Sequence, residues 1–203
     1  NMTVAGPGNL IVEAGRNVYQ ADQGRLTSVG PLFDLTPATR NGGAGITILT
    51  GAGEGGPNYQ AFADLYLNPL NQADPEYPLS HETNEGKVVK TYQAELTKWL
   101  SERYGYDAES PEAGLAYFEG LKPIERGIFI RQGYYDELKA GGREYNDADG
   151  ARFGSYVRGR NAVAVLFPEK DAGGNAISYA GDLTMCGGSG VRTLFGGNVE
   201  LMV

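Results

Sequence analysis

Short segments that repeat one pattern near both ends of the chain constrain its fold more than any other feature. Each starts with a glycine and a polar residue, and then places apolar or small residues at alternate positions. The segments are 8–12, 24–28, 181–185 and 197–201, with a looser copy at 44–48. Short alternating strands with glycine at the corners are typical of a β-solenoid. Antiparallel hairpins of a β-sandwich use similar strands and remain an alternative.

Glycine and charge divide the chain into three parts. Residues 1–56 contain 12 glycines and 7 charged residues, 57–168 contain 11 and 29, and 169–203 contain 8 and 6. A charged segment between two similar flanks indicates an insertion into a continuous structure. We therefore predict a mainly β fold, in which parallel β-helix coils at 1–56 resume at 173–203 after an α-helical insertion at 57–172. The side chains expected to point inward are Val12, Ile48, Leu183, Met185 and Val199.

Apolar residues at helical spacing predict several helices in the insertion. Asn58 and Ser110 are expected N-caps, and Pro123 is expected to start a further helix that ends at Gly141 and Gly142. A helix from about Val88 to Tyr104 and a last one over about 150–167 complete the bundle. Residues 68–85 contain three prolines without periodicity and are expected to form a loop.

Net charge and rare residues exclude several classes of function. The chain has 203 residues, 17 basic and 25 acidic side chains, and a net charge of −8, which argues against nucleic acid as a partner. Its longest apolar run, 162–167, is far too short to span a membrane. With one cysteine, Cys186, and one histidine, His81, it lacks an internal disulfide and the ligands of a usual zinc site. We expect no cofactor and no metal.

The segment 51–56 matches the G-x-G-x-x-G pattern of dinucleotide-binding loops. The match follows an apolar strand and precedes a predicted helix. However, the second strand and its acidic residue are missing where residues 70–75 read Leu-Asn-Gln-Ala-Asp-Pro. We interpret the segment as a flexible exit from the coils.

The insertion is rich in acidic residues, but the sequence marks no catalytic pair. Asp147 and Asp149 resemble the start of a calcium loop, yet Tyr145 and Tyr156 occupy the first and twelfth EF-hand positions, where carboxylates are required. An isolated calcium site and an acidic helix start both remain open. A hydrolase with an acidic site, for example one acting on carbohydrate, is the alternative to a non-enzymatic function.

Tyrosine and arginine side chains of the insertion form a candidate recognition surface. Tyrosine offers apolar contact together with a polar hydroxyl, which suits binding interfaces. Core packing for the tyrosines and ion pairing for the arginines are the alternatives. The candidate residues are Tyr134, Tyr135, Tyr145, Arg152, Tyr156, Arg158 and Arg160.

Particular strings add a family resemblance. Residues 141–146 (Gly-Gly-Arg-Glu-Tyr-Asn) and 155–160 (Ser-Tyr-Val-Arg-Gly-Arg) are the most specific, and 26–31, 66–69 and 181–185 contribute. From about residue 5 to its end, the chain resembles a segment of filamentous-haemagglutinin-family exoproteins. These are the long secreted adhesins of two-partner secretion in Gram-negative bacteria.

The resemblance implies a right-handed parallel β-helix and export through an outer-membrane partner. It also implies a secreted, cell-surface location and a role in adhesion, biofilm, virulence or cell contact. The expected partner is a host or bacterial cell-surface protein or glycan. No catalytic motif is carried over, so we expect a non-enzymatic segment that combines a scaffold with a helical decoration.

Overall fold

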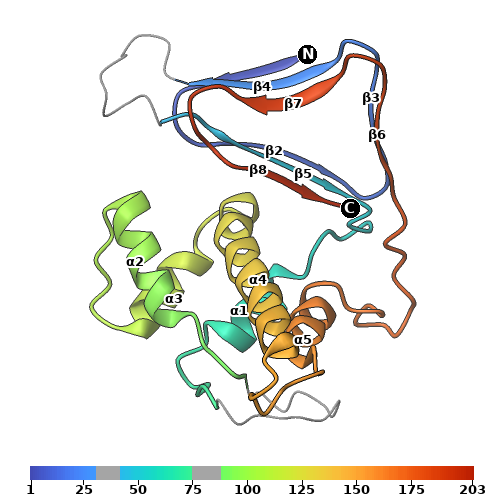
Figure 1. The fold of residues 1–203 in the computed structure, drawn as a ribbon. Helices are drawn as coiled ribbons and strands as arrows, with labels where there is room; N and C mark the ends of the chain where they lie inside the picture. The colour runs from blue at the N-terminus through green and yellow to red at the C-terminus, as the bar shows by residue number, and fades with distance from the viewer. Residues whose placement is uncertain (31–41, 75–87) are drawn as a thin grey trace. The chain divides into compact units, whose positions relative to one another are not determined.

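The computed structural model describes residues 1–30, 42–74 and 88–203. This part of the chain divides into two compact units (Figure 1). We call the first, Asn1–Pro57 with Lys170–Val203, the β unit. The second, Asn58–Glu169, is the helical unit.

Three small parallel sheets make up the β unit (Figure 1). Their strands are β1 (Met2–Ala5), β2 (Asn9–Ala14), β3 (Val18–Gln20), β4 (Arg25–Gly30), β5 (Gly45–Thr50), β6 (Leu183–Met185), β7 (Gly190–Thr193) and β8 (Val199–Met202). The strand orders are β1-β4-β7, β2-β5-β8 and β3-β6. Each sheet thus joins strands from both ends of the chain.

Register between the strands places apolar residues of different strands beside one another. In the second sheet, Ile46 pairs with Leu10 on one side and with Val199 on the other. Leu26, Ile46 and Ile48 form the buried core of the β unit, and Leu10, Val12, Val18, Leu183 and Val191 pack partly against it. Parallel sheets are usually buried, and among the described strands only β4 and β5 have neighbours on both sides.

The predicted fold class is wrong. About 35% of the described residues are helical and 22% are in strands, so this part of the chain is not mainly β. Within the described residues, strands of three to six residues form small parallel sheets and not a β-helix or solenoid. The sequence repeats identified strand segments correctly. The five described helices of the charged middle, however, contain more residues than the described strands.

Two residues expected to point inward are exposed. Ile48 is fully buried, and Val12 and Leu183 pack against the core. Met185 and Val199 are instead 46% and 44% exposed. Both lie on strands with a neighbour on one side only, β6 and β8, so the adjacent strand cannot cover them fully.

The helical unit contains five helices among its described residues. They are α1 (Tyr59–Tyr66), α2 (Gln93–Tyr104), α3 (Pro111–Glu119), α4 (Pro123–Asn146) and α5 (Val157–Leu166). The caps predicted for two of them are confirmed, since Asn58 and Ser110 accept hydrogen bonds from the backbone N–H groups of Ala61 and Ala113.

Helix α4 continues through the glycines that were predicted to end it. A Cβ atom at Gly141 would lie 3.0 Å from the backbone nitrogen of Gly159 in α5. A Cβ atom at Gly159 would clash with the ring of Tyr156. Glycine therefore permits the close approach of α4 and α5, which is a packing role that local propensity does not reveal.

Helix α2 starts later than predicted. Val88 forms an isolated parallel bridge with Ala73, and the backbone N–H of Tyr92 donates to Tyr66. These pairings hold residues 88–92 outside the helix. The end at Tyr104 agrees with the prediction, because Gly105 adopts the left-handed conformation with φ of 64°.

Replacing the cap residue Ser110 with alanine is expected to destabilise the helical unit by about 1 kcal/mol, because the N–H of Ala113 loses its acceptor. Urea unfolding followed by Trp99 fluorescence measures this change. Ser110→Asp is the matched control, since a carboxylate also caps, and it should restore most of the stability. Equal destabilisation by both variants would contradict the capping role.

Candidate functional site

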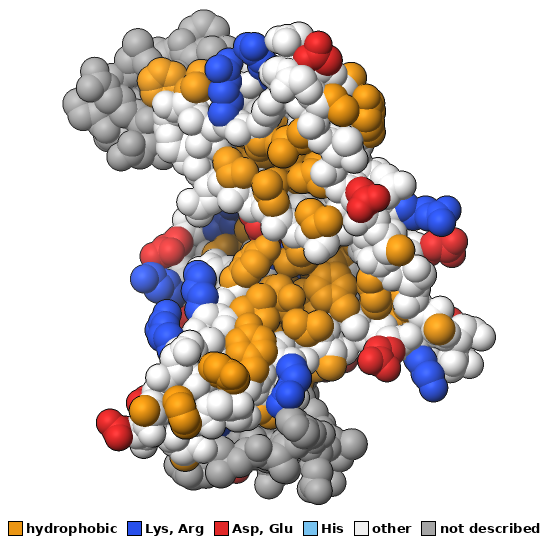
Figure 2. Space-filling model, turned by 45° about the vertical axis from the view of Figure 1, so that its right-hand side comes forward, with side chains coloured by type: hydrophobic (Ala, Val, Ile, Leu, Met, Phe, Trp, Pro, Cys, Tyr) orange, Lys and Arg blue, Asp and Glu red, His pale blue; other side chains and the backbone are white. Residues whose placement is uncertain are grey.

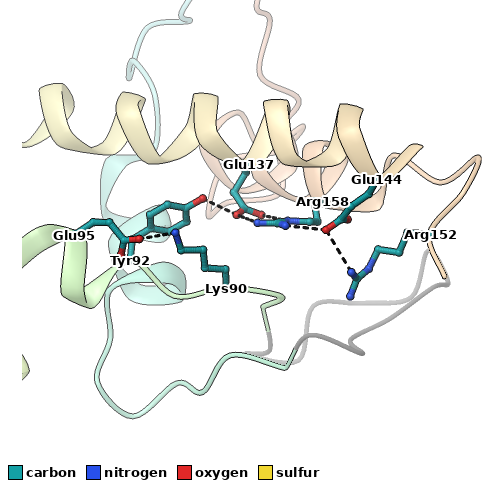
Figure 3. A network of polar contacts seen from close by, with 7 residues as sticks. All are labelled: Lys90, Tyr92, Glu95, Glu137, Glu144, Arg152 and Arg158. Carbon is teal, nitrogen blue, oxygen red and sulfur yellow. Dashed lines mark hydrogen bonds and ion pairs between the residues drawn. The ribbon is translucent and has the colours of Figure 1, made fainter. Parts of the chain in front are cut away.

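Glu137 on α4 is the centre of a buried polar network (Figure 3). The residue is 1% exposed. Arg158 of α5 donates to both of its carboxylate oxygens, from Nε at 3.0 Å and from Nη2 at 2.5 Å. The hydroxyl of Tyr92, just before α2, donates to Oε1 at 2.7 Å. The network therefore connects α4 and α5 with the start of α2.

The network extends along α4 to Glu144, two turns further on. Arg158 Nη1 donates to Glu144 Oε1 at 2.8 Å, and Arg152 Nη1 lies 3.4 Å from the same oxygen. Arg158 thus bridges two glutamates (Figure 3). At the other end, Lys90 lies over the ring of Tyr92, 4.7 Å from its centroid, and pairs with Glu95.

Burial and charge change the titration of these groups. Burial raises the pKa of the Tyr92 hydroxyl above its usual value, and the negative charge of Glu137 raises it further. Burial alone would lower the pKa of Arg158, but its hydrogen bonds and ion pairs with Glu137 and Glu144 outweigh this and raise it. The phenol and the guanidinium therefore keep their protons at neutral pH.

This arrangement holds helices together and leaves little freedom for acid or base chemistry. Glu137 and Glu144, two carboxylates that the sequence did not single out, both pair with Arg158. Glu137 accepts three hydrogen bonds, so both of its oxygens are occupied. A buried ion pair with these bonds is satisfied as a unit, whereas either partner alone would be an uncompensated charge.

The candidate recognition residues lie in different environments. Tyr134 is buried, 7% exposed, near the ring of Phe167. Tyr156 is half-buried and its hydroxyl donates to the backbone of Leu138. Arg152 and Arg158 belong to the buried network, and Tyr135 is half-buried. Tyr145 and Arg160 are exposed.

Two exposed aromatic residues lie near the end of α4. Tyr145 is 48% exposed and Phe153, in the following connection, is 60% exposed. Their segments are joined because the backbone N–H of Gly154 donates to the carbonyl of Tyr145. An open depression of about 600 Å³ on the last turns of α4 is lined by Lys139, Gly142, Arg143, Asn146 and Asp147. We call Tyr145 and Phe153 the aromatic tip.

Two other sequence motifs, the glycine-rich segment 51–56 and the acidic segment at Asp147 and Asp149, form local hydrogen bonds. Gly51, Gly53 and Gly56 have positive φ angles, and the first two donate to the backbone of Arg16 and Gly15. Asp147 accepts from the backbone of Asp149. Within the described ranges no group of three or more His, Cys, Asp or Glu residues is placed to hold a metal.

The single cysteine and the single histidine were considered above for a disulfide and a zinc site. Cys186 is a partly buried free thiol beside β6, and its backbone N–H donates to Gln20. His81 lies outside the described residues.

The sequence analysis missed Glu137 as the centre of the network. A helical spacing was nevertheless present, because Ile130, Tyr134, Glu137 and Gly141 all lie on the buried face of α4. A glutamate on such a face requires a buried cationic partner. The partner itself, Arg158, follows 21 residues later on another helix, so its identity depended on how α5 packs.

Comparisons with protein-family models, curated proteins and solved structures found no match to this chain. None of the helices in the described residues combines the length and apolar character that a bilayer crossing requires.

Proposed function

We propose that this chain is a non-enzymatic binding segment of a secreted bacterial cell-surface exoprotein, acting in adhesion, biofilm formation or cell contact. The observation that carries the proposal is the contrast within the helical unit. The buried Glu137 and the half-buried Glu144 pair with arginine, while aromatic side chains are exposed at the aromatic tip. The sequence resemblance to filamentous-haemagglutinin-family exoproteins supports the same class of function.

The aromatic tip is the part of the helical unit that we assign to recognition. Exposed tyrosine and phenylalanine provide large contact areas, and such residues often dominate binding energy. Lys139, Arg143 and Asp147 line the depression on the same end of α4 and supply charges of both signs. A cell-surface protein or glycan with apolar and polar groups fits this surface. Hydrophobic side chains also reach the surface elsewhere in both units (Figure 2).

The test replaces Tyr145 and Phe153 together with serine. If the tip carries recognition, retention of the labelled protein on fixed epithelial monolayers or on bacterial cells should fall roughly tenfold or more. The matched control replaces Leu70 and Ile124, which are 87% and 50% exposed on the same unit. It should retain binding, and equal loss in both variants would contradict the assignment.

A further inference from the structure

A cleft in the β unit is independent of the aromatic tip. Its volume is about 580 Å³, within the usual range for binding sites. The glycine-rich segment 53–56 forms part of its lining, together with Gly15, Arg16 and Asp171. The remaining lining comes from segment 176–180, outside the regular strands.

The residues that line the cleft include unpaired backbone groups and leave space for an added peptide strand. Ile177 and Ser178 donate and accept no backbone hydrogen bond within the described part of the protein. A Cβ atom at Gly55 would meet no atom within 4 Å, so no side chain fills the space beside that residue. An extended peptide can pair with such unpaired backbone groups, as in other cases of strand addition.

Charge in the cleft favours a basic ligand. The charged residues of its lining are one arginine, Arg16, and two carboxylates, Glu54 and Asp171, so the lining has a net negative charge. Asp171 stays ionised because the side chain and backbone of Asn175 donate to it and lower its pKa. Glu54 is exposed and its carboxylate forms no ion pair within the described residues. This balance opposes phosphate-bearing ligands and attracts lysine or arginine side chains.

We propose that this cleft binds an extended peptide segment carrying a basic side chain. The peptide backbone pairs with Ile177 and Ser178, and the basic side chain approaches Glu54 and Asp171. This site gives the glycine-rich segment 53–56 a role as a wall of the cleft, in which Gly55 leaves space for a main chain.

The experiment measures fluorescence anisotropy of two labelled, end-capped peptides with the full chain. One alternates threonine with lysine and the other alternates threonine with glutamate. The lysine peptide should bind at least roughly tenfold more tightly than the glutamate peptide. Gly55→Phe should weaken its binding by a similar factor. Gly190→Phe is the matched control, because it lies in the same unit outside the cleft lining and also adds a ring where no atom lies within 4 Å.

A second variant keeps the test decisive if Gly55→Phe does not fold. Glu54→Lys changes an exposed residue and should reverse the preference toward the glutamate peptide. Absence of lysine-peptide binding at millimolar protein overturns the proposal, as does equal binding of the two peptides. Binding of capped lysine alone as tightly as the peptide would also overturn it, because the site would then be a cation site.

Discussion

Replacing Arg158 with methionine is expected to lower the free energy of unfolding of the helical unit by about 3–5 kcal/mol. The substitution leaves Glu137 buried without its cationic partner and Glu144 with Arg152 only. A buried carboxylate without compensation is the origin of this large effect. Urea unfolding at neutral pH, followed by Trp99 fluorescence, measures it.

A variant that lacks all the polar groups around position 137 distinguishes the cost of an unpaired carboxylate from the cost of lost packing. Tyr92→Phe, Glu137→Met and Arg158→Met together replace the polar groups with apolar ones and leave no charge at position 137. This triple variant should regain most of the stability lost by Arg158→Met alone. A triple variant less stable than Arg158→Met would contradict the explanation.

Raising the pH above about 10 is expected to unfold the helical unit, because its buried tyrosines resist ionisation. Burial raises the pKa of both Tyr66 and Tyr92 in the folded state. Below the unfolded value near 10 both states stay protonated and stability is unchanged. Above it the unfolded chain releases protons that the folded chain retains. Stability should then fall by about 3 kcal/mol per pH unit for the two residues together.

Urea unfolding at several pH values between neutral and strongly alkaline gives this slope. Tyr66→Phe and Tyr92→Phe should each make the slope shallower, since each removes one proton from the balance, and the buried Tyr134, whose pKa burial also raises, accounts for part of the slope that remains. Tyr145→Phe is the control, because that side chain is 48% exposed and should leave the slope unchanged. A slope insensitive to both core substitutions would show that other groups cause alkaline unfolding.

Helix starts marked by a capping side chain or a proline were the most predictable feature, because these signals are local. Asn58, Ser110 and Pro123 begin helices through side-chain caps and a fixed backbone angle, which need no distant partner. The end of α4 was not predictable in this way. Gly141 is a stop signal by propensity, but its contact with Gly159 of α5 makes it a packing residue.

The prediction of a mainly β fold was wrong for a related reason. Period-two alternation identified strand segments such as β2 and β5, and it did not fix how many strands a sheet would contain. The exposure of Val199 depends on whether a further strand covers β8. Glu137 could not be recognised as a network centre from the sequence, because its role depends on Arg158 from another helix. The exposed ring of Phe153 depends on the path of the connection after α4.

Adhesion of the network-free triple variant tests the central claim most directly, which is that the polar centre of the helical unit is structural while the aromatic tip binds. Its retention on epithelial monolayers and bacterial cells is compared with that of the unsubstituted chain, after circular dichroism has verified folding. The account predicts retention within about twofold of the unsubstituted chain. Loss of retention in a folded triple variant, with retention kept after substitution of Tyr145 and Phe153, would contradict it.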